Sequence, residues 1–491
     1  MTPSDPHAAA HALDQVQLQI QEAFDLHKAG QLRQALAAYD RAIAAQPNFF
    51  EAHFGRGNVL EQMGDAASAV AAFDRAIAIN PAPEVYGNRG NALQKIDQFD
   101  AAVASYDKAL ALQPALAHVL FSRGIALKHL GRFEECLADH AKALAIQPDY
   151  IEAKKNIFSL HLAALQDAPL IDRLGAELLG DVTRNKIDTL IAKKIIPDFC
   201  VAHDLEQTAY LIAQGIESEG LREANLRLAE IHARCAPRVD PGGTVQPVEI
   251  SDVEAAAIAR WLRQPLRYRP QVPEHCLNPD NDWAGIEDRY FADISQIVQI
   301  DDMLSPQALA ELRRFCLVST VWNSAYINQY LGAFAIDGFV SPLHVKIAQE
   351  LRSRMPRIFG PHRLEHLWAF KYSQRMPRGI NVHADFARVN LNFWITPDDA
   401  NLDPAKGGMI VYDAQAPRSW SFDEYNNREQ AIYEFLKQNN AGARRVPYKC
   451  NRAVLFNSNL FHETDALHFK PGYENRRINV TYLFGRGLKS T

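Results

Sequence analysis

The chain has 491 residues and carries 52 Lys and Arg against 58 Asp and Glu, which gives a formal net charge of −6. At about 150 residues per domain, this length predicts roughly three domains. The acidic balance and the lack of a long Lys and Arg run argue against a general nucleic-acid or anionic-membrane binder. Hydrophobic residues make up 47 % and charged residues 22 %, so most of the chain should fold into ordinary globular domains.

The N-terminal segment and the cysteines bear on where the protein resides. The start, MTPSDPHAAAHALDQ, lacks the basic and apolar parts of an export signal, and the chain has no run of about 18 apolar residues that would span a bilayer. The 6 cysteines are scattered without a CxxC pair, which indicates neither a disulfide framework nor a structural zinc site. We therefore expect an unexported protein of the reducing cytoplasm, with no membrane partner.

The first third of the chain is an internal repeat. The segments YDRAI, FDRAI, YDKAL and HAKAL begin at Tyr39, Phe73, Tyr106 and His140, at spacings of 34, 33 and 34 residues, and Pro47, Pro81, Pro114 and Pro148 follow at the same intervals. Each unit predicts two short amphipathic helices, because a proline cannot continue the second helix and small residues let the first one pack closely.

This pattern resembles the tetratricopeptide repeat. Gly57, Gly90 and Gly124 occupy the family's small position, and Gly30, Gly64 and Gly131 occupy its turn between helices. Asp97 replaces the turn glycine of the third repeat, and because Asp tolerates turn conformations we expect a local adjustment and an unbroken stack. The resemblance implies an all-α solenoid of four repeats at about residues 14–148, closed by an apolar helix over residues 150–165, so that the first domain covers residues 14–166.

The resemblance also implies a partner, because such solenoids generally bind extended peptides or proteins in their concave face. The polar residues that recur on the first helices are Arg56, Arg89 and Arg123, with Asn58, Asn88 and Asn91. Arg can clamp a carboxylate and Asn can hydrogen-bond a peptide backbone, so these residues would suit peptide binding. The alternative, which we favour, is that these side chains make contacts within the repeats or lie on solvated faces.

The middle region, residues 167–285, is predicted to be mainly helical and offers no recognisable chemistry. The segment Pro237–Pro247 is rich in Pro and Gly and is typical of a linker or exposed loop. Ser251 and Glu254 have the spacing of a capping box, which predicts a helix that ends near Arg263, before Pro265.

The last third changes character and is predicted to be rich in strands. The segment IVQIDDMLSPQALAELRRFC, from Ile297, predicts a strand, a turn and a helix capped by Ser305. Short strand-like runs follow: HLWAFKY, INVHADF, RVNLNFWIT, GGMIVYD, RAVLFNSNLFHE and RRINVTYLFG, with a helix at about residues 423–437. Many short strands at the end of a long chain favour a barrel or a sandwich.

Three residues in these strands are candidate metal ligands. His383 and Asp385 are two positions apart in a predicted strand, so both side chains should point to the same face, and His462 ends another strand 79 residues later. Two imidazoles and one carboxylate on one side of a metal leave the opposite coordination positions open. Non-haem Fe(II) enzymes use this arrangement to bind a cosubstrate and dioxygen. With 17 histidines in the chain, about one such HxD triplet is expected by chance. Whether this triplet binds a metal must therefore be judged from the neighbouring motifs.

Those neighbours resemble the Fe(II)- and 2-oxoglutarate-dependent dioxygenases, in particular the prolyl-hydroxylase-like branch. The motifs, in order, are IDDMLSPQALAEL, the HxD at His383 and Asp385, the Gly407-Gly408 strand start, AVLFNSNLFH ending at His462, and Arg477-Ile478-Asn479-Val480-Thr481. The resemblance implies an α+β double-stranded β-helix, or jelly roll, over residues 286–491, with Fe(II) held by His383, Asp385 and His462.

The resemblance further implies 2-oxoglutarate as a cosubstrate anchored by an arginine of the last strand. Arg477 shares one strand face with Asn479 and Thr481, whereas the competitor Arg476 shares the other face with Ile478, so the polar face favours Arg477. Other candidates for the cavity wall are Tyr372, which the family often places near the same carboxylate, and, by strand parity, Asn390, Asn392 and Trp394. Each of these four has an ordinary core role as its alternative, and we favour that alternative for Asn390, Asn392 and Trp394.

The predicted protein is therefore multidomain: a repeat solenoid, a helical connecting region and a jelly roll. The function implied is a hydroxylase that uses Fe(II), 2-oxoglutarate and dioxygen on a C–H bond of a protein or peptide recruited by the repeats. The alternatives are a small-molecule hydroxylase whose repeats bind a partner, and an inactive adaptor. A nucleic-acid substrate fits the acidic balance poorly.

Overall fold

The computed structural model describes residues 6–235, 245–326, 328–372 and 379–487. The chain divides into two compact units, Met1–Leu160 and His161–Thr491. Within the ranges just given, no helix combines the length and the apolar character needed to cross a membrane.

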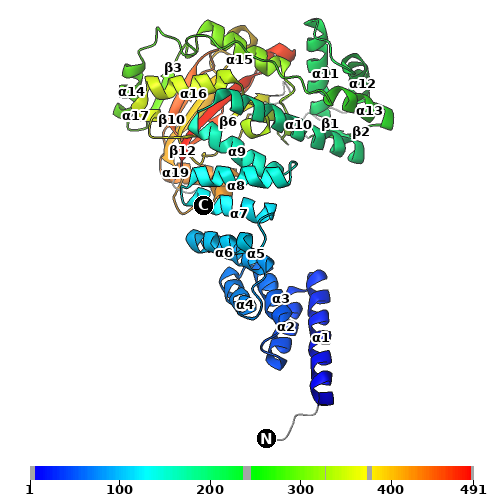
Figure 1. The fold of residues 1–491 in the computed structure, drawn as a ribbon. Coiled ribbons are helices and arrows are strands. Elements are labelled where there is room, and N and C mark those ends of the chain that lie inside the picture. The colour runs from blue at the N-terminus through cyan, green and yellow to red at the C-terminus, as the bar shows by residue number, and fades with distance from the viewer. Residues whose placement is uncertain (1–5, 236–244, 327, 373–378, 488–491) are drawn as a thin grey trace. The chain divides into compact units, whose positions relative to one another are not determined.

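The first unit consists of helices that pack in consecutive antiparallel pairs (Figure 1). The helices are α1 (Pro6–Lys28), α2 (Leu32–Ala45), α3 (Phe50–Gln62), α4 (Ala66–Ile79), α5 (Pro83–Lys95), α6 (Phe99–Leu112), α7 (Ala117–His129) and α8 (Phe133–Ile146), and α9 (Ile151–Ala164) crosses the boundary between the units. The two helices predicted for each repeat are therefore present.

In the second and third repeats, the recurring aromatic residue packs against a glycine of the preceding helix. A Cβ atom on Gly57 would lie 2.4 Å from the Phe73 ring, and one on Gly90 would lie 2.4 Å from the Tyr106 ring. A side chain at either position would collide with the ring, which is why the repeat keeps a small residue there. The predicted close packing at the small positions is confirmed.

The turns between paired helices use left-handed backbone. Gly30, Gly64 and Gly131 have φ angles of 74°, 86° and 75°, and Asp97 takes the same conformation at 58°. Helix α5 ends at Lys95 and α6 begins at Phe99, so the substitution leaves the stack unbroken, as predicted. Asp costs less than most residues in this conformation.

The three arginines of the repeats form ion pairs inside the solenoid. The pairs are Arg56 with Asp40 at 2.7 Å, Arg89 with Asp74 at 2.6 Å, and Arg123 with Asp139 at 2.7 Å and Asp107 at 2.5 Å. Asn88 donates to Asn58 at 2.8 Å, and Asn91 accepts from Tyr106 at 2.8 Å. The structure thus supports the alternative, contacts within the repeats, for these side chains.

The second unit begins with a helical region that shares its core with the neighbouring sheet region. Its helices are α10 (Ala168–Lys193), α11 (Asp198–Ala213), α12 (Leu221–Cys235) and α13 (Asp252–Leu262), and the short strands β1 (Ile195–Pro197) and β2 (Pro247–Glu249) pair antiparallel. Residues 236–244 of the predicted linker lie outside the described ranges. The capping box of Ser251 and Glu254 is present. Val318, which belongs to the sheet region, is buried in the same apolar cluster as Trp261.

The remainder of this unit is built on two antiparallel sheets. The larger has the order β3 (Ile297–Ile300), β10 (Ala453–Asn457), β7 (Ala387–Trp394), β12 (Ile478–Arg486), β6 (Leu364–Tyr372), β5 (Tyr330–Phe334) and β4 (Ser324–Ala325). The smaller has the order β11 (Leu460–Thr464), β8 (Met409–Gln415) and β9 (Ala443–Val446). This is an α+β region, as predicted.

Helices cover the outer face of the larger sheet (Figure 1). They include α14 (Trp283–Ala292), α15 (Pro306–Val318), α16 (Pro342–Arg354) and α17 (Pro356–Phe359). Lys371 of β6 donates to the Cys316 carbonyl of α15 at 3.2 Å, and Tyr482 of β12 donates to the His344 carbonyl of α16 at 3.3 Å. The predicted cap of α15 is confirmed, because Ser305 accepts from the Ala308 amide.

The smaller sheet packs on the inner face of the larger one. Val411 of β8, Val446 of β9, Val454 of β10 and Trp394 of β7 share one buried cluster. The single helix expected near residues 423–437 is instead two short ones, α18 (Phe422–Asn426) and α19 (Glu429–Gln438), the first opened by a capping box of Ser421 and Glu424. The space between the sheets holds the residues singled out by the sequence.

Candidate metal centre

The HxD triplet lies just outside a regular strand. His383 forms an isolated antiparallel bridge with His462 of β11, through N–O distances of 3.0 and 2.8 Å in the two directions, and Asp385 precedes the start of β7 at Ala387. The prediction of a continuous strand was therefore wrong at this point. The bridge, a contact between residues far apart in sequence, aligns the two histidines instead.

The three side chains converge. One ligand atom each of His383, Asp385 and His462 lies within 4.8 Å of the other two. His383 Nε2 is 3.9 Å from Asp385 Oδ1, and His462 Nε2 is 3.5 Å from Asp385 Oδ2. The side chains of Asp385 and His462 are only 7 % and 6 % exposed. Two imidazole nitrogens and a carboxylate oxygen at these separations fit one ion at bonds of about 2 Å.

Each imidazole is oriented by a carbonyl of its own segment. His383 Nδ1 lies 2.8 Å from the Asn381 carbonyl, and His462 Nδ1 lies 3.0 Å from the Leu460 carbonyl. A carbonyl only accepts, so each Nδ1 carries the proton and each Nε2 presents its lone pair toward Asp385. This is the arrangement that outer hydrogen bonds impose on metal-binding histidines.

The charge states of the group suit a cation. Burial, with the neighbouring His462, lowers the pKa of His383 to about 4, so its ring is neutral at pH 7. Burial alone would raise the pKa of Asp385, but the two imidazoles lower it and the net shift is downward. Asn390 holds the carboxylate by donating to Asp385 Oδ2 at 2.7 Å. The set offers two imidazole nitrogens and one anion.

The triad opens into a small pocket between the two sheets. Besides the triad, its walls are Trp368, Phe370 and Tyr372 of β6, Asn392 of β7, Asn479 and Thr481 of β12, Arg477, Ile380, Met409, Glu463 and Thr464. Its volume is about 40 Å³, room for about three water molecules. Tyr372, Asn392, Arg477 and Thr481, all predicted from the sequence, therefore reach the same pocket as the triad.

Arg477 is a buried cation held by neutral groups. Its side chain donates to the carbonyls of Gly407 at 2.7 Å and Gly408 at 3.1 Å and lies 4.8 Å from the Tyr372 ring. It is 2 % exposed, and burial lowers its pKa. Among the described residues, no carboxylate forms an ion pair with it. A buried guanidinium without a counter-ion is costly unless an anion joins it.

The other predicted cavity residues divide between the pocket and its surroundings. Arg476 faces away from the pocket and pairs with Glu206 of α11 at 2.8 Å. Asn392 donates to Thr481 at 2.9 Å inside the pocket. Asn390 does not line the pocket but donates a hydrogen bond to Asp385. Trp394 lies in the apolar cluster between the sheets, with its ring 5.6 Å from the Arg477 guanidinium.

Two polar residues of the pocket, Glu463 and Thr464, were not singled out from the sequence. Glu463 accepts from the hydroxyls of Tyr412 at 2.5 Å and Tyr433 at 2.6 Å, and Thr464 lies 3.3 Å from the Tyr372 hydroxyl. Both residues directly follow His462 in the sequence, and this proximity to a candidate ligand was the only sign that they line the site. Their partners come from distant segments, so their roles could not be inferred from spacing.

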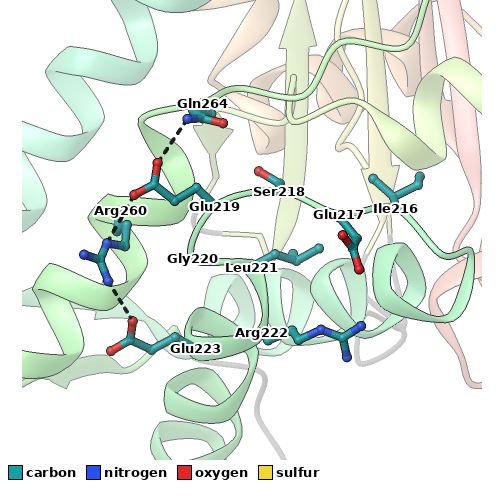
Figure 2. A pocket seen from close by; sticks show the side chains of 10 residues that line it. All are labelled: Ile216, Glu217, Ser218, Glu219, Gly220, Leu221, Arg222, Glu223, Arg260 and Gln264. Carbon is teal, nitrogen blue, oxygen red and sulfur yellow. Dashed lines mark hydrogen bonds and ion pairs between the residues drawn. The ribbon is translucent and has the colours of Figure 1, made fainter.

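A more open groove of about 630 Å³, which shares no residue with the metal pocket, lies at the turn between α11 and α12 (Figure 2). Its charged residues largely satisfy one another: Arg260 pairs with Glu219 at 3.5 Å and Glu223 at 3.4 Å, and Gln264 donates to Glu219 at 3.2 Å. The metal pocket, though smaller, is the better candidate site because its polar groups converge on one point.

Comparison with known proteins identifies the first unit. Tetratricopeptide-repeat family models match residues 21–82 and 83–116. The N-terminal part of the chain therefore consists of tetratricopeptide repeats, which generally bind peptides or proteins. No curated protein matches the sequence.

Several solved structures are similar to part of the chain. MamA is 21 % identical over 30 % of this chain and 80 % of that one, with a TM-score of 0.29. A MamA fragment from Desulfovibrio magneticus RS-1 is 22 % identical over 30 % and 84 %, with a TM-score of 0.29. YrrB, described as a TPR protein with an unusual peptide-binding site, is 24 % identical over 29 % and 74 %, with a TM-score of 0.28.

Proposed function

We propose that the second unit is an Fe(II)- and 2-oxoglutarate-dependent dioxygenase that hydroxylates a C–H bond. The observation that carries this proposal is the placement, in one pocket, of a two-histidine, one-carboxylate set and a buried arginine that lacks an anionic partner among the described residues. The first suits Fe(II) with open positions, and the second suits the far carboxylate of a dicarboxylate. Either feature alone would be weaker support.

The triad and three further pocket residues have definite tasks in this proposal. When bound, iron would let dioxygen oxidise 2-oxoglutarate to succinate and carbon dioxide, with the second oxygen atom inserted into a substrate C–H bond. His383, Asp385 and His462 hold the ion, and Arg477, with Thr481 and Tyr372 beside it, pairs with the distal carboxylate. Asp385, Arg477 and Thr481 are buried, which strengthens the charge pairing.

The pocket is too small for the substrate as well. Its volume is only about 40 Å³. The substrate then approaches from outside. Phe334 of β5, half-buried, contacts Trp368 and Phe370 at ring distances of 6.0 Å each, and this aromatic row leads to the pocket, which favours an apolar substrate group.

The repeats supply the substrate in this proposal. Tetratricopeptide repeats generally bind peptides or proteins, so a bound partner would meet the pocket at a raised effective concentration. The paired arginines Arg56, Arg89 and Arg123 are engaged within the solenoid, and we therefore assign recruitment to the repeats as a whole and give these three side chains no dedicated part in it. A protein or peptide remains the proposed substrate.

The test is a balance of products. The full-length protein, supplied with Fe(II), 2-oxoglutarate and air, should consume dioxygen and release succinate and carbon dioxide in equal amounts, even if slowly without substrate. Addition of a cell lysate, followed by mass spectrometry, should reveal a protein heavier by one oxygen atom. Absence of succinate under all these conditions, from protein shown to contain iron, would exclude the proposed reaction.

A further inference from the structure

A second cavity, of about 290 Å³, lies on the outer side of the larger sheet. Its walls come from α10, β1, α11 and α13 on one side and from Trp322, Asn323, β4 and β5 on the other. Lys371 of β6 lies over the Trp322 ring at 4.4 Å, on the strand face opposite to Tyr372, so the sheet separates this cavity from the metal pocket. The volume is at the lower end for small-molecule sites.

The floor of the cavity is apolar and its mouth is partly open. The buried side chains of the floor are Leu190, Ile196, Ile258, Leu262, Trp322 and Leu331. Ile195, at the rim, is 47 % exposed, and the neighbouring rim residues Asn185 and Thr189 are exposed polar residues of α10. A ligand with an apolar body of a few carbon atoms would cover surface that water now meets.

Two opposite charges face this cavity without closing on each other. Asp204 of α11 is 9 % exposed and Lys186 of α10 is half-buried, and both line the cavity. No carboxylate of the described residues forms an ion pair with Lys186. Asp204 Oδ1 accepts from His203 Nδ1 at 2.9 Å. Burial alone would raise the pKa of Asp204, but Lys186 and His203 lower it, so the carboxylate is ionised at pH 7.

We propose that this cavity binds a small zwitterion with an apolar body, namely a free α-amino acid with an apolar side chain. The ligand ammonium would pair with Asp204, its carboxylate with Lys186, and its side chain would lie on the apolar floor. A monocarboxylate brings no cation to Asp204, and a monoamine brings no anion to Lys186, so both should bind less well. This proposal does not depend on the chemistry of the metal pocket.

The first experiment is calorimetric titration of the full-length protein with L-leucine, L-methionine and L-phenylalanine. At least one should bind saturably, with one molecule per chain. For leucine the matched half-ligands are isocaproate, which lacks the ammonium, and isoamylamine, which lacks the carboxylate; each should bind about tenfold more weakly or worse. The absence of binding by all three amino acids at millimolar concentration, or equal binding by isocaproate, would overturn the proposal.

Variants locate the binding. Lys186→Met and Asp204→Asn should each weaken binding of the best amino acid by about tenfold or more. Asn can still accept from His203, so the local hydrogen bond is kept. The matched control is Lys193→Met, which removes an exposed charge of the same helix outside the cavity and should leave binding unchanged. Wild-type affinity in Lys186→Met, in protein with unchanged circular dichroism, would refute the assignment.

Discussion

Replacement of Arg477 by methionine removes the guanidinium while keeping an unbranched side chain in the pocket. Arg477 is 2 % exposed, and loss of one partner of a buried charge pair costs about 2 to 5 kcal/mol. The affinity for 2-oxoglutarate should therefore fall by about 30-fold to several thousand-fold. The Fe(II) affinity should change little, because Arg477 is not one of the three candidate ligands.

The stability of the ligand-free variant should change much less than its affinity for 2-oxoglutarate. The carbonyls of Gly407 and Gly408, both buried, lose their donor, at about 1 to 3 kcal/mol each. In compensation, the variant no longer buries a cation without an anionic partner, a cost of several kcal/mol. The two effects oppose each other, so unfolding by urea should remain cooperative with a modest shift of midpoint.

The assay is anaerobic calorimetric titration of 2-oxoglutarate into Fe(II)-loaded protein. The control is Arg476→Met, which breaks the ion pair with Glu206 on the other side of the strand and should alter 2-oxoglutarate affinity by less than about threefold. A larger loss in Arg476→Met than in Arg477→Met would mean that the wrong arginine faces the cosubstrate. Equal, undiminished affinity in both would refute a role for either.

Three further predictions concern the ligands, the repeats and the division of the chain. His383→Ala or His462→Ala should abolish Fe(II)-dependent succinate release while the helical circular dichroism of the repeats persists. His140→Phe should stabilise α8 by about 1 to 3 kcal/mol, measured by hydrogen exchange of the full chain, because neither ring nitrogen of this buried histidine has a hydrogen-bond partner among the described residues. The piece 161–491 should keep substrate-uncoupled decarboxylation of 2-oxoglutarate, whereas 286–491 should not fold, since it lacks the helices that complete the core around Val318.

His140 should also make the stability of α8 depend on pH. Burial lowers its pKa to about 4, below the value of about 6.5 expected in the unfolded chain. The unfolded state therefore binds more protons between about pH 6.5 and 4, and the stability of α8 should fall as the pH decreases through that window. His140→Phe should remove this part of the pH dependence. An unchanged pH profile in the variant would show that His140 is not its source.

The sequence predicted those features that rest on local spacing. The repeats were evident because an aromatic residue and a glycine such as Phe73 and Gly57 must recur together for the helices to pack. The turn at Asp97 and the caps at Ser251 and Ser305 likewise depend on a few neighbouring residues. In the same way, the motifs around the three candidate ligands were enough to bring together His383, Asp385 and His462.

Features that rest on long-range pairing were not predicted. The bridge between His383 and His462 replaces the expected strand, and it depends on a register between segments 79 residues apart. Contacts of the arginines within the repeats were expected, but the partner of each, such as Asp40 of the preceding helix for Arg56, is known only from the folded solenoid. The packing of the middle helices on Val318 is of the same kind.

The most direct test of the central claim is anaerobic binding of Fe(II) and then 2-oxoglutarate, followed by absorption spectroscopy. The account predicts one Fe(II) per wild-type chain, a visible charge-transfer band that appears when 2-oxoglutarate is added, and loss of both in Asp385→Ala. Wild-type protein that binds no Fe(II), or a band of full intensity in Asp385→Ala, would contradict the assignment of this pocket as a dioxygenase site.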